Sequence, residues 1–302
     1  MTQEIAQIIA KSRSVSNHSS IEAMPQMSRL HLLENANEAE VVEFLSIRPV
    51  HTVVMKSFIQ DNDLESADNR GKFYGYRSSE GTLEGIALIG HTTLIESRSN
   101  DSLVAFALIA RVSETPIHII MADGKTTEKF WQFFADDNRA PRLTCTELLF
   151  ELNFPFMVQN CKWEVRLAKS EELEQIAEAH AEVAFIESGV DPMQKDREGF
   201  LKRTLKRIEK NRTFVVFENG KLVFKADIVA ETSDVIYLEG IYVAPEYRGQ
   251  NVGSECLAAI SLQLIDRVSN ICLLSNIEFK NAHRSFAKAG FKNTDACQTI
   301  FV

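Results

Sequence analysis

The sequence is poor in the features that mark secreted, metal-binding or membrane proteins. Its 302 residues include five cysteines, an odd number with no closely spaced pair and no histidine at ligand spacing. This usage indicates neither a disulfide framework nor a zinc site. No apolar run approaches the length of a membrane span, and Met1 to Glu4 lacks the basic flank of a secretory signal. We therefore expect a cytoplasmic protein without a metal.

Basic residues are also too few to favour binding to nucleic acid or to a membrane surface. Lys and Arg number 33 against 42 Asp and Glu, which gives a net charge of -9. An acidic protein repels polyanions and mildly favours a cationic amine as substrate. Hydrophobic residues make up 45% and charged residues 25% of the chain, as in ordinary globular domains. The length predicts two domains.

The most informative stretch joins a hydrophobic strand to a helix through a loop that contains glycine. A β-rich run covers residues 235–243, and apolar residues recur at helical spacing from Leu257 to Val268. Arg248, Gly249 and Gly253 lie between these two segments. The first N–H groups of a helix lack intrahelical acceptors, and the helix dipole adds partial positive charge, so the loop predicts a phosphate site. Glycine lets the phosphate approach the backbone closely.

This loop resembles motif A of the GNAT N-acetyltransferase superfamily, Arg/Gln-x-x-Gly-x-Gly/Ala, which holds the pyrophosphate of coenzyme A. The matching residues run from Arg248 to Gly253, with Asn251 in place of the usual first glycine. Asn is the non-glycine residue that best tolerates a left-handed backbone. The resemblance implies acetyl-CoA as co-substrate. It implies cofactor-binding roles for Ile241, Tyr242, Val243, Arg248, Gly249, Gln250, Asn251, Val252, Gly253, Ser254, Asn276 and Phe286.

The order of elements extends the resemblance over residues 163–302. Asn219-Gly220 between two alternating segments predicts a β-hairpin. Residues 281–291 resemble the closing motif of the family, Asn-x-x-Ala-x-x-x-Tyr-x-Lys-x-Gly-Phe, with Phe279 in place of the usual Asn and Phe286 in place of the usual Tyr. The patterns predict strands at 161–167, 212–218, 221–231, 235–243 and 271–276, and helices at 170–188 from an N-cap at Ser170, 196–210 and 281–290.

The first half shows the same order. The patterns predict strands at 30–34, 72–78, 83–90, 92–96, 117–121 and 143–152, and helices at 37–45, 51–59, 102–111 and 126–135. We infer an α/β (α+β) chain with two GNAT-like folds in tandem, each a mixed, mostly antiparallel sheet flanked by helices. The domains are expected at 1–28 (a mobile arm or a helix lying on another surface), 29–158 (a degenerate copy) and 159–302 (the acetyltransferase domain). An unrelated first α/β domain is the alternative.

The degenerate copy is expected to bind no coenzyme A. Its junction between strand and helix, Ser97 to Asp101, contains no glycine. We expect this copy to contribute packing surface, and one wall of an acceptor pocket at most, rather than chemistry.

Glu239 is the candidate general base, because it lies on the strand whose end lines the cofactor in the superfamily. A carboxylate near the amine, or joined to it by water, could remove its proton. Gly240 is a candidate β-bulge that separates this strand from its neighbour. The main-chain N–H of Val243 would donate to the thioester oxygen as charge develops. A carboxylate on a solvated strand face is the alternative reading of Glu239.

The usual general acid is missing. The family commonly has a tyrosine hydroxyl where this chain has Phe286, and the alternative donors are Ser285, Tyr242 and Tyr247. A free thiol titrates near pH ~8.5, so coenzyme A can also leave as a thiolate. In structural terms Phe286 is expected to pack against neighbours on its own helix.

Two functions remain open on the sequence. One is an N-acetyltransferase that moves an acetyl group from acetyl-CoA to a primary amine, small-molecule or peptide, by direct attack in a ternary complex. The alternative is a non-catalytic acyl-CoA-binding or interaction protein that retains the fold. Asn251, Phe279 and Phe286, which depart from the family motifs, support this alternative. The identity of the acceptor and the oligomeric state, a homodimer included, stay open.

Overall fold

The computed structural model describes residues 27–135, 139–153 and 160–302, which form two compact units. The first unit contains the described residues up to Thr146 together with Cys297–Val302, and the second contains Glu147–Ala296. The expected boundary at 158–159 lies outside the described residues, as does the expected N-terminal arm apart from its last two residues. None of the helices in the described ranges is long and apolar enough to cross a membrane.

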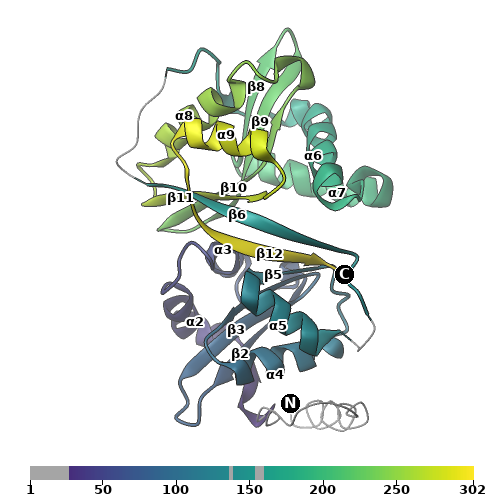
Figure 1. The fold of residues 1–302 in the computed structure, drawn as a ribbon, viewed down its shortest axis with the longest axis vertical. Helices are drawn as coiled ribbons and strands as arrows, with labels where there is room; N and C mark the ends of the chain where they lie inside the picture. Colours follow the sequence, from purple (N-terminus) through teal and green to yellow (C-terminus); the bar gives the residue numbers. More distant parts are fainter. Residues whose placement is uncertain (1–26, 136–138, 154–159) are drawn as a thin grey trace. The chain divides into compact units, whose positions relative to one another are not determined.

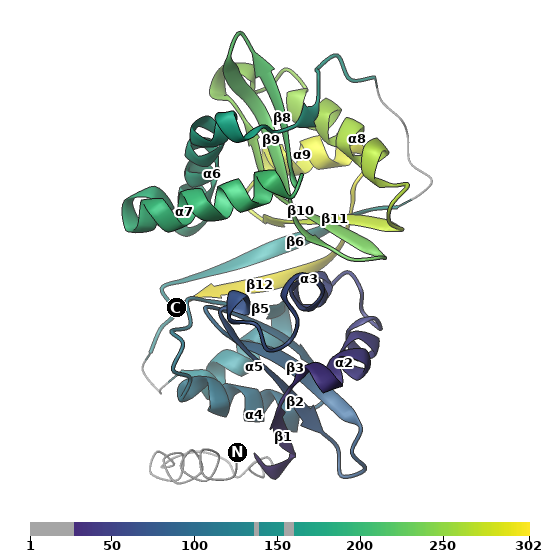
Figure 2. The ribbon, with the colours of Figure 1, turned by 180° about the vertical axis from the view of Figure 1, so that it is seen from behind.

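The first unit is a sheet with a pair of helices on each face. Its elements are β1 (Leu30–Leu32), α2 (Glu38–Leu45), α3 (Val53–Asn62), β2 (Gly71–Arg77), β3 (Leu83–Gly90), β4 (Thr92–Ser97), α4 (Asn100–Arg111), β5 (Ile119–Asp123) and α5 (Gly124–Phe134). Strands β1 to β5 pair in sequence order, with only β4 and β5 parallel among these pairs. One buried cluster joins α4 and α5 to the sheet, and another joins α2 and α3 to it; Figure 1 and Figure 2 show the two faces. The predicted element order is confirmed.

One strand of the first unit comes from the far end of the chain. Strand β12 (Lys292–Phe301) pairs antiparallel with β5 through Cys297 to Phe301. The expected division placed these residues with the second domain, whereas in the structure they complete the sheet of the first unit. This strand was not predicted, because its first four residues are polar and exposed and leave no alternating apolar pattern.

The second unit repeats the same plan. Its elements are β7 (Arg166–Leu167), α6 (Leu173–Ser188), α7 (Pro192–Glu209), β8 (Thr213–Glu218), β9 (Lys221–Glu231), β10 (Val235–Val243), α8 (Val252–Leu264), β11 (Asn270–Asn276) and α9 (Lys280–Ala289). The strand order is β6-β11-β10-β9-β8-β7, in which β6 (Leu143–Asn153) contributes Glu147 to Asn153. Helices α8 and α9 pack on one face, and α6 and α7 on the other.

Local predictions hold in the second unit with two corrections. The Asn219-Gly220 turn forms with both residues at positive φ, 50° and 76°. The strand predicted at 161–167 is wrong for most of its length, because Cys161 and Trp163 pack onto the apolar core of the unit and only the last two residues pair. Ser170 does not cap the helix, since the Glu172 carboxylate accepts a hydrogen bond from the Lys169 N–H at 2.8 Å instead.

A β-bulge in β10 confirms the prediction made for Gly240. Glu239 lies opposite Asp227 and Tyr242 lies opposite Lys225, so the register between β10 and β9 shifts at this point. Gly240 has φ 60°, and Lys225 Nζ donates to its carbonyl oxygen at 2.8 Å. A Cβ atom on Gly240 would lie only 2.8 Å from that ammonium. Glycine is therefore required both by the backbone angle and by the buried lysine.

Beyond the bulge, β10 separates from β11. The two strands pair in parallel from Val235 to Leu238 on β10, and the ladder ends where Leu238 meets Leu273. The rest of β10 still pairs with β9. A gap at the carboxyl ends of two parallel strands is where ligands bind in sheets of this kind.

Gly240→Ala should destabilise the second unit by about 1–3 kcal/mol, because it combines a left-handed backbone with a clash against the buried lysine. Gly220→Ala is the matched control, since Gly220 has φ +76° but no atom within 4 Å of an added Cβ. Urea unfolding compares them. Equal losses in both variants would show that the contact with Lys225 does not determine the residue at 240.

Candidate active site

The loop before α8 has the backbone that a phosphate site needs. Gly249 and Asn251 both have positive φ, 80° and 63°, and Asn251 is the N-cap of α8. The expectation that Asn251 tolerates a left-handed backbone is confirmed. The Glu255 N–H donates to the Asn251 carbonyl, so the N–H groups ahead of it in the first turn have no acceptor one turn back in the helix.

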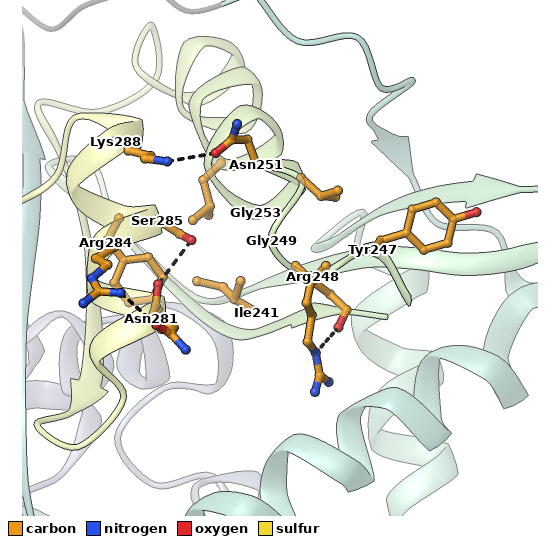
Figure 3. Close-up of a pocket in the computed structure, with 15 residues that line it drawn as sticks. Ile241, Tyr247, Arg248, Gly249, Asn251, Gly253, Asn281, Arg284, Ser285 and Lys288 are labelled. Atoms are coloured by element: carbon orange, nitrogen blue, oxygen red, sulfur yellow. Dashed lines mark hydrogen bonds between the residues drawn. The ribbon is translucent and has the colours of Figure 1, made fainter. Parts of the chain in front are cut away.

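A cavity of about 470 Å³ opens beside this loop, within the second unit. It lies between the end of β10, the start of α8 and one side of α9 (Figure 3). Its lining residues are Ile241, Val243, Tyr247, Arg248, Gly249, Asn251, Val252, Gly253, Leu257, Asn281, Ala282, Arg284, Ser285, Phe286 and Lys288. The cavity adjoins both the helix N-terminus and the gap between β10 and β11.

Three cationic side chains line this cavity. Arg248 donates from Nε to the Val243 carbonyl at 2.9 Å and from Nη2 to Glu182 at 3.1 Å. Lys288 Nζ donates to Asn251 Oδ1 at 2.9 Å, and Arg284 contacts the side chain of Asn281 at 3.3 Å. Together with the N–H groups of the first turn of α8, they favour an anionic ligand.

The structure brings most of the expected cofactor residues to the cavity, but not all. Ile241, Val243, Arg248, Gly249, Asn251, Val252, Gly253 and Phe286 line it. Four others do not. Tyr242 packs with the cluster under α6 and α7, Gln250 donates to the Glu246 carbonyl, Ser254 donates to the Asn251 carbonyl, and Asn276 accepts from the Glu278 N–H.

Beyond Phe286 and Ser285, sequence reasoning missed the polar and cationic side chains that α9 contributes to the cavity. Asn281, Arg284 and Lys288 were not expected as site residues, yet they line it. Their spacing of three and four residues places them on one face of a helix. That periodicity could have identified a polar face of the helix, but it could not have shown that this face borders the cavity.

The backbone of β10 presents Val243 to the gap. The N–H of the next residue, Ala244, donates to the Val223 carbonyl of β9 at 2.8 Å. Successive N–H groups of an extended chain point to opposite sides. The Val243 N–H therefore points away from β9, toward the side on which β11 has separated.

Phe286 is a packing residue in this structure. It is 5% exposed and meets the Phe150 ring edge to face, with ring centroids 5.4 Å apart, and Ala282 and Ala289 belong to the same cluster. The packing interpretation is confirmed. Of the alternative proton donors, Ser285 and Tyr247 line the cavity, whereas Tyr242 does not.

Glu239 lies next to the bulge and outside the cavity lining, and its side chain is half-buried rather than fully solvated. Burial raises the pKa of Glu239 above its usual value, although the cations of Arg207 and Lys225 act against this shift. The hydroxyl of Tyr237 donates to its carboxylate. A carboxylate whose pKa is raised is better matched to accept a proton near neutral pH.

A buried polar network supports the strands beneath Glu239. Lys225 and Asp227 are 0% and 2% exposed and form an ion pair at 2.7 Å. Asp227 also accepts from Arg207 at 3.1 Å and from Thr213 at 2.8 Å. His180 lies at the rim, where burial and the charge of Lys225 lower its pKa to about 3. His180 is thus a neutral structural residue, and the described ranges contain no cluster of His, Cys, Asp and Glu able to hold a metal ion.

Comparisons with known proteins agree with this geometry. The family profile described as an acetyltransferase (GNAT) domain matches residues 209–293. Among solved structures, an acetyltransferase from the GNAT family of Colwellia psychrerythraea is 14% identical with a TM-score of 0.54, and the match covers 90% of this chain and 99% of that one. A GCN5-related N-acetyltransferase from Sphaerobacter thermophilus is 11% identical with a TM-score of 0.57, over 92% and 96% of the two chains.

The tandem form is also represented among the similar structures. A tandem GNAT protein from the clavulanic acid biosynthesis pathway is 11% identical with a TM-score of 0.55, and the match covers 89% of this chain and 97% of that one. No curated protein matches the chain in sequence. The fold is the GNAT fold, and GNAT-like structure extends over nearly the whole chain. Residues 209–293 match the GNAT acetyltransferase domain family.

The burial of His180 predicts how the stability of the second unit depends on pH. Its pKa is lowered in the folded state, so the unfolded chain takes up a proton near pH ~6.5 while the folded protein does not. Stability is therefore fully present above that pH and is lost as the pH falls. Between pH 7 and 5 the loss from this group is about 2 kcal/mol, provided only that its folded pKa lies well below 5.

His180→Gln should lose correspondingly less stability over the same interval. Urea unfolding followed by Trp163 fluorescence, in a Trp131→Phe background, would report on the second unit. Identical pH slopes for the variant and its parent would contradict the assignment of His180 as a neutral buried side chain.

Proposed function

We propose that this protein is an N-acetyltransferase that moves an acetyl group from acetyl-CoA to a primary amine. The observation that carries the proposal is the cation-lined cavity at the N-terminus of α8, which adjoins the gap between β10 and β11. Acetyl-CoA has an anionic end, which the cation-lined cavity would bind, and a thin acyl arm, which the adjacent gap would admit. The match of residues 209–293 to the GNAT acetyltransferase domain supports the same reaction class.

The pyrophosphate would bind to the N–H groups between Gly249 and Ser254. Glycine at 253 is not required by packing, because an added Cβ would meet Val243 and Ser285 at ordinary contact distances of 3.5 and 3.7 Å. Close approach of a ligand to the backbone explains it instead. The acyl arm would then run into the gap, where the Val243 N–H can donate to the thioester oxygen.

The amine would approach from the other face of β10, the face that carries Glu239. Glu239 would accept the proton of the amine, directly or through water, and the neutral amine would attack the thioester carbon in a ternary complex. The carbon–sulfur bond then breaks and coenzyme A leaves as a thiolate or takes a proton. Phe286 has no proton to give, so Ser285, Tyr247 or water would supply it.

The electrostatics on this face favour a cationic acceptor. Burial, together with repulsion by the carboxylates of Glu239 and Glu147, raises the pKa of Glu187 to about 8. Such repulsion is relieved when a protonated amine enters. We propose a small-molecule or peptide amine as the partner, in line with the net charge of -9, rather than nucleic acid or a membrane.

A second candidate function is binding of acyl-CoA without turnover. The burial of Phe286 favours it, because the usual hydroxyl is absent and its position is filled by aromatic packing. Release of free thiol from acetyl-CoA over a panel of amines separates the two candidates.

Gly253→Glu should abolish acetyl-CoA binding, since it places bulk and like charge against the pyrophosphate. The wild type should bind one acetyl-CoA per chain, and saturation at a hundredfold excess over Kd should stabilise it by about 2.7 kcal/mol. Calorimetry measures both. Gly253→Ala is the milder comparison, because its Cβ fits against the protein and adds no charge, so it should weaken binding less than Gly253→Glu does.

Two results would contradict this assignment. Normal affinity in Gly253→Glu would show that the phosphate loop lies elsewhere. If the wild type bound two acetyl-CoA molecules per chain and Gly253→Glu bound one, the first unit would also bind the cofactor.

Glu239→Gln should retain acetyl-CoA affinity while turnover at neutral pH falls by roughly a hundredfold, because the base is removed and the shape is kept. Raising the pH should partly restore the rate, since the amine then loses its proton unaided. A rate-versus-pH profile on any accepted amine tests this, with Glu218→Gln at the end of β8 as the control. Parallel profiles at equal rates would remove Glu239 from the mechanism.

A further inference from the structure

The contact between Asn251 and Lys288 joins α8 and α9 at the wall of the cavity. Lys288 on α9 donates from Nζ to Asn251 Oδ1 at the start of α8, at 2.9 Å. Both side chains line the cavity, and Figure 3 shows them facing each other. The acceptor is a side-chain oxygen. The glycine that the superfamily usually has at this position could not make this contact.

The Asn251 side chain is used in an unusual way for an N-cap residue. An N-cap Asn commonly accepts a hydrogen bond from an N–H of the first helical turn. Asn251 makes no such bond. Its oxygen faces Lys288 instead, so the first-turn N–H groups are not consumed by the cap and can serve a ligand.

The other cation of the motif is held differently. Arg248 donates to the Val243 carbonyl and to the carboxylate of Glu182, which neutralises much of its charge. Lys288, by contrast, contacts a neutral amide, the side chain of Asn251. Because Asn251 is the N-cap of α8, this contact places a cationic side chain at the start of that helix.

We propose that Asn251 and Lys288 form a clamp that binds the pyrophosphate of coenzyme A, in which Lys288 supplies the charge and Asn251 positions it. This inference rests on the proposed function, since it names residues for the same cofactor. On this view Asn251 is a functional replacement for the glycine of the family, and it contributes affinity that a glycine cannot.

The test is a double-mutant cycle on acetyl-CoA binding by calorimetry. Asn251→Gly keeps the left-handed backbone and installs the usual residue of the family, and Lys288→Met removes the charge but keeps the length. Each should weaken binding by about tenfold, as expected for loss of a charge-assisted contact, and the double variant should bind no more weakly than either alone. Lys280→Met, an exposed lysine on α9 outside the cavity lining, controls for the loss of charge and should bind normally.

A second ligand shows which phosphate group of coenzyme A Lys288 contacts. Acetyl-dephospho-CoA lacks the 3′-phosphate but keeps the pyrophosphate, so Lys288→Met should weaken binding of both ligands by the same factor. If the loss disappears with the dephospho ligand, Lys288 recognises the 3′-phosphate and the pyrophosphate assignment is overturned. Asn251→Asp adds a further check, because it retains a partner for Lys288 but brings negative charge to the phosphate, and it should bind more weakly than Asn251→Gly.

The outcomes separate the clamp from the proposed function. If the wild type binds no acetyl-CoA, the proposed function fails. If the wild type binds but Asn251→Gly binds equally well, or the two single losses simply add, the clamp alone is overturned. Unfolding of each variant without ligand establishes that the comparison is made between folded proteins.

Discussion

The buried ion pair between Lys225 and Asp227 is the interaction on which the site in the second unit depends. Lys225 also donates to the Gly240 carbonyl, which holds the bulge in β10. The bulge coincides with the point where β10 leaves β11. A buried pair of this kind is weak evidence for stability. Its role here is geometric, because it fixes the point at which β10 separates from β11. That point lies next to the carboxylate of Glu239.

The first unit has the same fold but closes the equivalent region with its own side chains. Ser99 caps α4 by accepting from the Ser102 N–H at 3.2 Å, so a serine occupies the helix start that a phosphate would need. Arg48 pairs with Glu96 and Asp123 at 3.1 and 3.4 Å, beside the end of β4 where pairing with β5 stops. One fold thus presents an open helix terminus in one unit and a capped one in the other, and function follows these local differences.

Much of this could be predicted from sequence because the relevant signals are local. The Asn219-Gly220 turn, the Gly240 bulge and the left-handed Asn251 each follow from what a residue type allows at its own position. Strand β12 could not be predicted, because its first four residues are polar and exposed, so its local pattern does not indicate a strand. The cationic face of α9 was missed for a different reason. Helical spacing defines a face, and only tertiary packing decides what that face meets.

The two faces of β10 divide the proposed chemistry. Ile241 and Val243 turn toward the cavity, and Tyr242 packs on the opposite face under α6 and α7. The amine and the thioester would therefore meet through the gap in the sheet rather than in a shared pocket. In that arrangement the carboxylate needs to reach only the amine, and the backbone N–H only the thioester oxygen. A dedicated acid at the thiol is the least necessary component, since a thiolate is a stable leaving group near neutral pH. The packing of Phe286 at that position is compatible with turnover on these physical grounds.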